Sequence, residues 1–209
     1  MQKMNIKKIS ILILILIVAD QLLKIWVKTS MQLDESIIVC ADWFQLRFIE
    51  NNGAAFGMQI PSDGGFDWGK LILGLFRVVM SVGIGWLICH LMKKKGEEKT
   101  PTGVLIGLAL IMAGAVGNII DSAFYGLIFS ESTPNAVAHL GDGYAGFMMG
   151  KVVDMFYFPL FKWDSVPSWL DFLVDRNNYF FGAIFNLADA YISVAAFYLI
   201  LFQGKFFMR

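Results

Sequence analysis

Four long apolar runs restrict what this chain can fold into. They occupy residues 9–27, 71–92, 102–120 and 179–202. Each is close to the roughly 20 apolar residues that a helix needs to cross the hydrocarbon core of a bilayer. Hydrophobic residues make up 57% of the 209-residue chain, more than soluble domains usually contain. We therefore expect an all-α membrane protein with four transmembrane helices in a single domain, residues 1–209.

Basic residues predict how these helices are oriented. They gather before the first run, between the second and third runs, and after the fourth, as Lys3, Lys7, Lys8, Lys93, Lys94, Lys95, Lys99, Lys205 and Arg209. All three groups fall on one side of a four-helix topology, which the positive-inside rule assigns to the cytoplasm. Both termini are then cytoplasmic, and the loops 28–70 and 121–178 are extracytoplasmic.

The first outer loop has the pattern of a small β element. Apolar and polar residues alternate over residues 44–48, which is typical of a half-buried strand. The apolar stretch 37–39 and a turn near residues 41–42 predict its hairpin partner. The segment 51–57 has neither a strand nor a long-helix pattern, and its small residues suit a loop with close backbone contacts.

Four aspartates lie in or beside apolar segments. They are Asp20, Asp121, Asp154 and Asp189. Burying a carboxylate in hydrocarbon is costly, and acids inside a membrane generally mark functional sites. In the predicted topology all four lie toward the outer face. This convergence predicts a polar site just below the outer membrane surface.

Two Asn-x-x-Asp motifs, Asn118–Asp121 and Asn186–Asp189, each place two polar side chains on one face of a helix. The amide can orient a neighbouring carboxylate or a substrate carbonyl by donating a hydrogen bond. In the first motif, capping of a helix end is an equal alternative, because the third apolar run ends there. Asp189 lies inside the fourth run without a capping duty, which favours a functional role.

Asp20 and Lys24 are four residues apart, so a helix places them on one face, where they can form an ion pair. We expect this pair to be structural, since it fixes helix packing or supports a loop. A carboxylate that a lysine already neutralises is a poor proton acceptor.

A pair of aspartates at a membrane surface suits peptide hydrolysis. Two close carboxylates do not both ionise easily, so they share a proton. One then acts as a general base on water while the protonated one polarises the peptide carbonyl. Asp189 is the first candidate. Asp154, after two valines in a predicted loop, has a weak signal of its own, and Asp121 and Asp142 compete for the second place on spacing alone.

Other classes of protein fit less well. A carrier or proton relay is the main alternative, but transporters place buried acids near the bilayer midplane between repeats, and this sequence shows no such repeat. A net charge of zero offers no basic face for nucleic acid. The chain has no His-Glu-x-x-His motif, no Gly-x-Ser-x-Gly motif and no metal-type cysteine spacing. We expect no metal and no organic cofactor.

Five short motifs follow one another along the chain. They are Asp20-x-x-x-Lys24, Asn51-x-Gly53-Ala54-Ala55-Phe56, Gly117-Asn118-x-x-Asp121, Val153-Asp154-Met155 and Phe185-Asn186-x-Ala188-Asp189. In this order, and on a four-helix topology, they resemble lipoprotein signal peptidase, also called signal peptidase II. The resemblance extends over nearly the whole chain. Each motif alone is weak, but five in order are specific.

The resemblance implies an aspartic endopeptidase with Asp154 and Asp189 as its catalytic pair. Asn118 and Asn186 would be polar residues beside this pair that orient the scissile peptide or the aspartates. Asp121 would belong to the same polar group.

It also implies that Asn51 and Gly53 belong to a loop that covers the substrate. That substrate would be a prolipoprotein whose cysteine carries diacylglycerol, cleaved just before this cysteine. The enzyme would lie in the bacterial cytoplasmic (inner) membrane among lipids, with its site near the outer, periplasmic face. We expect a monomer.

The chain departs from the family pattern at several positions. Ser122 stands where the pattern has an arginine, and residues 131–150 and 162–178 are extensions. An acid cluster without a cation raises its own pKa values. We therefore expect another outer cation, Arg77 or Lys151, to replace the arginine.

Overall fold

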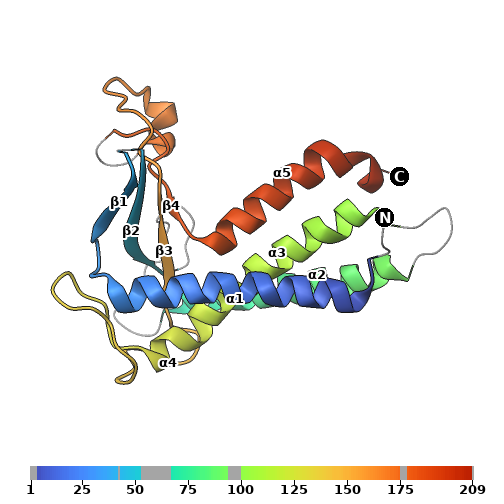
Figure 1. Cartoon of the computed structure of the whole chain (residues 1–209), viewed down its shortest axis with the longest axis horizontal. Helices are drawn as coiled ribbons and strands as arrows, with labels where there is room; N and C mark the ends of the chain where they lie inside the picture. Colours follow the sequence, from blue (N-terminus) through green and yellow to red (C-terminus); the bar gives the residue numbers. More distant parts are fainter. Residues whose placement is uncertain (1–3, 42, 53–66, 94–99, 175–177, 209) are drawn as a thin grey trace. The chain divides into compact units, whose positions relative to one another are not determined.

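The computed structural model describes residues 4–41, 43–52, 67–93, 100–174 and 178–208 (Figure 1). Of the motif that begins at Asn51, the residues from Gly53 to Phe56 lie outside the described residues. The long helices are α1 (Ile6–Ser30), α2 (Trp68–Met92), α3 (Thr102–Ile120) and α5 (Leu187–Phe207). Helical stretches over residues 6–30, 68–92, 102–128 and 187–207 are long and apolar enough to cross a membrane. Four such spans confirm the predicted fold class.

The third span extends beyond its predicted end. α3 is followed directly by a π turn, η3 (Asp121–Tyr125), and by one short turn, α4 (Gly126–Ile128). The apolar stretch is therefore 27 residues long. Because the helical stretch does not end at Asp121, the capping alternative for this residue is wrong. π turns inside helices are often found at functional sites.

The fourth helix begins later than the sequence suggested. α5 starts at Leu187 rather than at Tyr179, because Ile184 and Phe185 form a short strand, β4, instead. An apolar run alone does not distinguish a packed strand from a helix. Here the Phe185 ring packs against Phe156 at 5.9 Å between ring centroids.

The predicted hairpin forms and belongs to a larger sheet. β1 (Ser36–Cys40), β2 (Phe44–Asn51), β3 (Val152–Tyr157) and β4 make a four-stranded antiparallel sheet in sequence order. Asp154 therefore lies in a strand and is buried, not in a loop as predicted. The two valines before it belong to the same strand, so this β-branched pair was a strand signal.

A bulge changes which residues of β2 face Asp154. Leu46 pairs with Phe156 and Ile49 with Asp154, so three steps along β2 match two along β3. Residues directly opposite each other share a face of the sheet. The extra residue therefore puts Asn51, the last residue of β2, on the same face as Asp154.

Contacts divide the chain into two compact units. The helical unit comprises residues 1–22, 74–120 and 187–209, and the sheet unit comprises residues 23–73 and 121–186. In the helical unit, Ile9, Ile88, Val104 and Leu199 bring one buried side chain from each long helix into a common core. The single domain over residues 1–209 stays a prediction.

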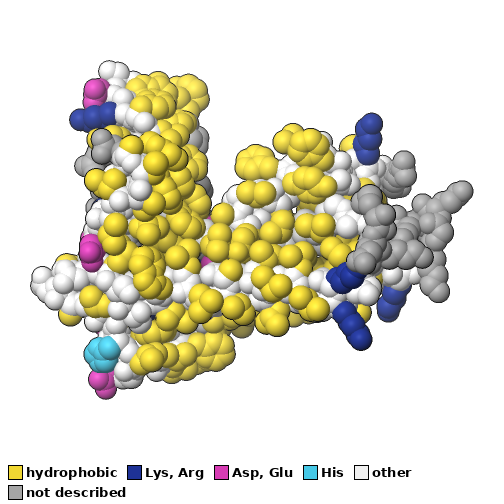
Figure 2. Space-filling model, in the orientation of Figure 1, with side chains coloured by type: hydrophobic (Ala, Val, Ile, Leu, Met, Phe, Trp, Pro, Cys, Tyr) yellow, Lys and Arg dark blue, Asp and Glu magenta, His cyan; other side chains and the backbone are white. Residues whose placement is uncertain are grey.

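The outside of the helical unit is apolar. Val79 on α2 and Ile200 on α5 are 67% and 71% exposed, respectively. Figure 2 shows hydrophobic side chains over much of the visible surface and basic side chains near the end that carries both termini. This distribution suits helices surrounded by lipid.

Asp20 joins three helices within this unit. It is fully buried in α1, and its Oδ1 accepts the N–H of Ala188 in the first turn of α5, at 2.9 Å. The Gln21 amide donates to Asp20 Oδ2 and to the Gly117 carbonyl of α3, both at 3.2 Å. The first amides of a helix lack partners within it, so Asp20 caps α5 from a neighbouring helix.

We expect Gly117→Ala to destabilise the protein. A Cβ at this position would lie 2.6 Å from Asp20 Oδ2 and 3.3 Å from the Ala188 Cβ. Overpacking of this kind costs about 1–3 kcal/mol. Thermal unfolding in detergent should show a lower Tm.

The matched control is Gly83→Ala in α2, where a Cβ would meet no atom within 4 Å. Alanine is the better helix former, so this variant should keep or raise the Tm. Equal losses in both variants would contradict the proposed close contact at Gly117.

Candidate active site

Asp154 is held by two amides within the sheet unit. The Asn51 Nδ2 donates to its Oδ2 at 3.2 Å, and the Asn186 Nδ2 donates to its Oδ1 at 2.7 Å. The Asp154 residue is 3% exposed and Asn186 is fully buried. A hydrogen bond to each oxygen fixes the plane of the carboxylate. The structure thus brings together three of the residues that the sequence singled out.

Asp189 is held by one amide within the helical unit. The Asn118 Nδ2 of α3 donates to Asp189 Oδ1 at 2.8 Å. Asp189 lies in the first turn of α5, near the start of the helix, although the apolar run 179–202 placed it further inside. A carboxylate in this first turn is stabilised by the positive end of the helix dipole.

Asp121 anchors the strand that carries Asp154. Its Oδ2 lies 2.8 Å from the Lys24 Nζ, and both side chains are fully buried. The same oxygen accepts the backbone N–H of Val153 at 3.3 Å. Asp121 therefore holds β3 at the residue directly before Asp154. The expected pair between Asp20 and Lys24 stays a prediction.

A second buried ion pair went unnoticed in the sequence. Lys28 of α1 donates to Glu50 of β2, and their side chains are 0% and 2% exposed. Lys28 follows Lys24 by one helical turn, and a lysine on an apolar helix is itself a functional signal. The sequence therefore contains a signal for this pair in the position of Lys28.

The cation that replaces the family arginine is not assigned by these contacts. The Lys151 Nζ lies 3.4 Å from both Glu50 Oε2 and Glu131 Oε1. The Arg77 carbonyl accepts the Ser81 hydroxyl at 2.8 Å. Compensation by Arg77 or Lys151 at Ser122 stays a prediction.

Comparison with known proteins identifies the family. The family model described as signal peptidase (SPase) II matches residues 12–204. This chain belongs to the signal peptidase II family. It is therefore a membrane protease, and the resemblance carried by the five motifs is confirmed.

Curated relatives agree with this family assignment. A lipoprotein signal peptidase of Porphyromonas gingivalis is 44% identical over 198 residues, which cover 93% of this chain and 82% of the relative. One from Amoebophilus asiaticus is 33% identical, over 86% of this chain and 70% of the relative. A solved bacterial membrane enzyme shares the fold with a TM-score of 0.60 and 20% identity, over 98% of this chain and 92% of that one.

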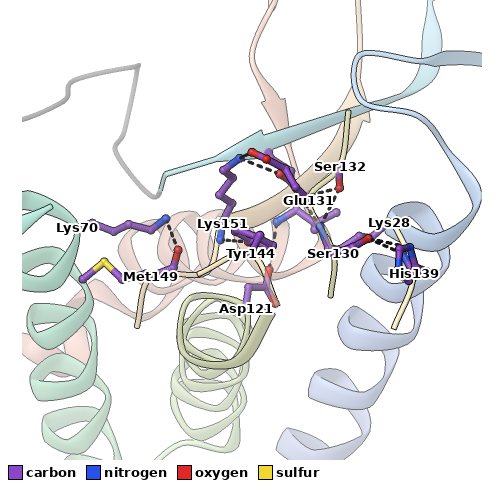
Figure 3. Close-up of polar contacts among 12 residues, drawn as sticks. Lys28, Lys70, Asp121, Ser130, Glu131, Ser132, His139, Tyr144, Met149 and Lys151 are labelled. Atoms are coloured by element: carbon purple, nitrogen blue, oxygen red, sulfur yellow. Dashed lines mark hydrogen bonds and ion pairs between the residues drawn. The ribbon is translucent and has the colours of Figure 1, made fainter. Parts of the chain in front are cut away.

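Tyr144 packs beside Lys28 of the second buried ion pair (Figure 3). Its hydroxyl oxygen accepts the backbone N–H of Lys151 at 2.7 Å. Burial raises the pKa of the Tyr144 phenol above its ordinary value of 10.0, and the nearby Glu50 carboxylate adds to this rise. The phenol therefore stays protonated at neutral pH.

We expect Lys24→Met to destabilise the protein strongly. It leaves the buried Asp121 carboxylate without its lysine, and breaking a buried pair typically costs about 3–5 kcal/mol. Thermal unfolding should show a large drop in Tm. In the control Lys162→Met, the lost pair with Asp164 is exposed, so the change should stay below about 1 kcal/mol. Similar Tm values for the two variants would contradict a compensating role for Lys24.

Tyr144 should make stability fall at high pH. Above pH about 10 an unfolded tyrosine loses its proton while folded Tyr144 keeps it, so the folded state binds more protons. The free energy of unfolding then falls as the pH rises, by up to about 1.4 kcal/mol per pH unit. Tyr144→Phe should show a shallower decline when Tm is followed from neutral to alkaline pH. Parallel curves would show that burial of this phenol does not contribute.

Proposed function

We propose that this chain is an aspartic endopeptidase that removes the signal peptide from diacylglyceryl-modified prolipoproteins. Cleavage falls just before the lipidated cysteine, and Asp154 and Asp189 form the catalytic pair. The strongest support comes from the asparagine side chains that donate hydrogen bonds to these two aspartates. Each aspartate accepts a hydrogen bond from an asparagine of a different segment.

The chain path supports the pairing of the two acids. Asn186 donates to Asp154 and precedes Asp189 by three residues. Three residues of extended chain span at most about 11 Å. The segment that orients one carboxylate therefore continues directly into the helix that carries the other.

The proposed reaction needs one ionised and one protonated aspartate. The ionised carboxylate takes a proton from water, and the resulting hydroxide attacks the scissile carbonyl carbon. The protonated carboxyl donates to the carbonyl oxygen, which gives a neutral tetrahedral intermediate. This intermediate collapses by breaking the C–N bond. The leaving amine of the cysteine takes a proton from the first aspartate, and one hydroxyl of the intermediate returns its proton to the second, which restores the starting state of both acids.

Aromatic residues on the sheet suit a substrate that carries lipid. Phe156 lies two residues beyond Asp154 on β3, so both face the same side of the sheet. Phe156 packs with Phe44 and Phe185, at 6.2 and 5.9 Å between ring centroids. These half-buried rings give Asp154 an apolar neighbourhood. The curated relatives named lipoprotein signal peptidase support the same class of substrate.

The orientation in the membrane is part of the proposal. With both termini in the cytoplasm, the sheet unit and the two aspartates lie at the periplasmic side of the inner membrane. Asn51 would begin the segment that covers the substrate, and Asn118 and Asn186 would keep the carboxylates oriented. A monomer would contain every residue that the reaction requires.

Replacing either aspartate should abolish cleavage. Asp154→Asn and Asp189→Asn each keep the side-chain shape but remove the acid, so we expect kcat to fall at least about a hundredfold. The measurement is cleavage of a diacylglyceryl-modified prolipoprotein by purified enzyme in detergent, with a chelator present. Unchanged Tm values would show that both variants fold.

Asp142→Asn is the matched control, because the Asp142 side chain is 90% exposed, and its activity should be unchanged. Full activity of Asp154→Asn with loss in Asp121→Asn would reassign the pair to Asp121. Absence of cleavage by the wild type would contradict the proposal and favour the carrier alternative.

A further inference from the structure

Glu50 lies in a buried charge cluster directly before Asn51. The Lys28 ammonium and the Ser132 hydroxyl both donate to Glu50 Oε1, the hydroxyl at 2.9 Å. Lys28 also donates to Ser132 Oγ at 2.9 Å, and the Lys151 Nζ lies 3.4 Å from Glu50 Oε2. Figure 3 labels Lys28, Ser132 and Lys151, which come from separate segments of the chain. We name these four residues the Glu50 cluster.

The Glu50 cluster is not built for stability alone. Replacing a buried ion pair by apolar residues is often neutral or stabilising, because the charges must be taken out of water. Glu50 Oε2 has an ion pair but no hydrogen bond among the described residues. A hydrogen-bond network in which one oxygen lacks a hydrogen bond adds little stability. The position of the Glu50 cluster in the fold therefore says more about its role.

The sheet geometry connects this cluster to Asp154. Glu50 pairs with Val153 and Asn51 with Val152, so neighbouring side chains on β2 project from opposite faces. Glu50 is anchored on one face, while the Asn51 amide reaches Asp154 on the other. Asn51 is also the last residue of β2, where an unanchored strand end would fray. The anchor at Glu50 thus fixes the backbone from which Asn51 donates.

The extension between Asp121 and Asp154 supplies further contacts to this strand end. The Tyr144 ring centroid lies 5.2 Å from the Lys28 Nζ and 5.3 Å from the Lys151 Nζ. Lys70 donates to the Met149 carbonyl at 2.8 Å and to Asn52 Oδ1 at 3.3 Å. Cations over an aromatic face are attracted to it. The extension therefore contributes an aromatic ring and a backbone carbonyl to cations near the end of β2.

We propose that Glu50 is a positioning residue for peptide cleavage, acting through Asn51 on Asp154. The extension 131–150 serves this role by providing Ser132 and Tyr144, and Lys151 follows it directly. This inference rests on the proposed function of Asp154. It gives the extension a task within the enzyme, namely holding the strand end that orients the carboxylate.

The test is a double-mutant cycle with Glu50→Gln and Asn51→Ala, using the same prolipoprotein cleavage assay. Displacement of a reacting group by about 1 Å can reduce rates strongly, so we expect Glu50→Gln to lower kcat on the order of tenfold. KM should change less than about twofold, because Glu50 does not touch the substrate. In the Asn51→Ala background the same substitution should have almost no further effect on kcat.

Glu131→Gln is the matched control, since Glu131 shares the Lys151 partner and loses the same charge but does not lie on β2. Its kcat should equal that of the wild type. If Glu50→Gln does not fold, Ser132→Ala replaces it in the cycle, because it removes only one hydrogen bond to Glu50. A smaller loss of kcat that disappears in the Asn51→Ala background would support the proposal.

Additive effects of Glu50→Gln and Asn51→Ala, with Asp154→Asn inactive, would overturn this inference and leave the proposed function intact. The same holds if Glu50→Gln lowers only the Tm. An active Asp154→Asn would instead overturn the proposed function, and the role of Glu50 with it.

Discussion

Two buried lysines, one helical turn apart on α1, determine where the sheet unit can place its strands. Lys24 is compensated by Asp121 and Lys28 by Glu50, and all four side chains are at most 2% exposed. An uncompensated charge at such positions is strongly unfavourable, so each acid must reach its lysine. Asp121 also binds the backbone of β3. Charge compensation, in addition to apolar packing, therefore fixes the strand that carries Asp154.

The sequence was sufficient for the parts of the fold that depend on local patterns. Apolar length predicted the four spans, and period-two alternation predicted the hairpin. It failed where a segment takes its structure from a distant neighbour. The residues of β4 were predicted to belong to an apolar helix, because their partner strand is distant in the sequence. Asp154 was predicted to lie in a loop for the same reason. The bulge in β2 was also invisible, since no residue type marks it.

The candidate site was predictable as a list of residues but not as a set of contacts. The two Asn-x-x-Asp motifs indicated that each amide orients a neighbouring carboxylate or a substrate carbonyl, but not which carboxylate it contacts. In the structure, the Asn118 amide serves Asp189 and the Asn186 amide serves Asp154. Both contacts join residues far apart in the chain, and sequence periodicity gives no information about such contacts. Glu50 was missed because its role follows from its position next to Asn51 in a strand.

The cap that Asp20 gives to α5 has a consequence for biosynthesis. Asp20 belongs to the first span, and the Ala188 amide that it accepts follows 168 residues later at the start of the last span. Asp20 is therefore synthesised long before the helix α5 whose first turn it caps. The helix start next to Asp189 is complete only after the final span has been inserted.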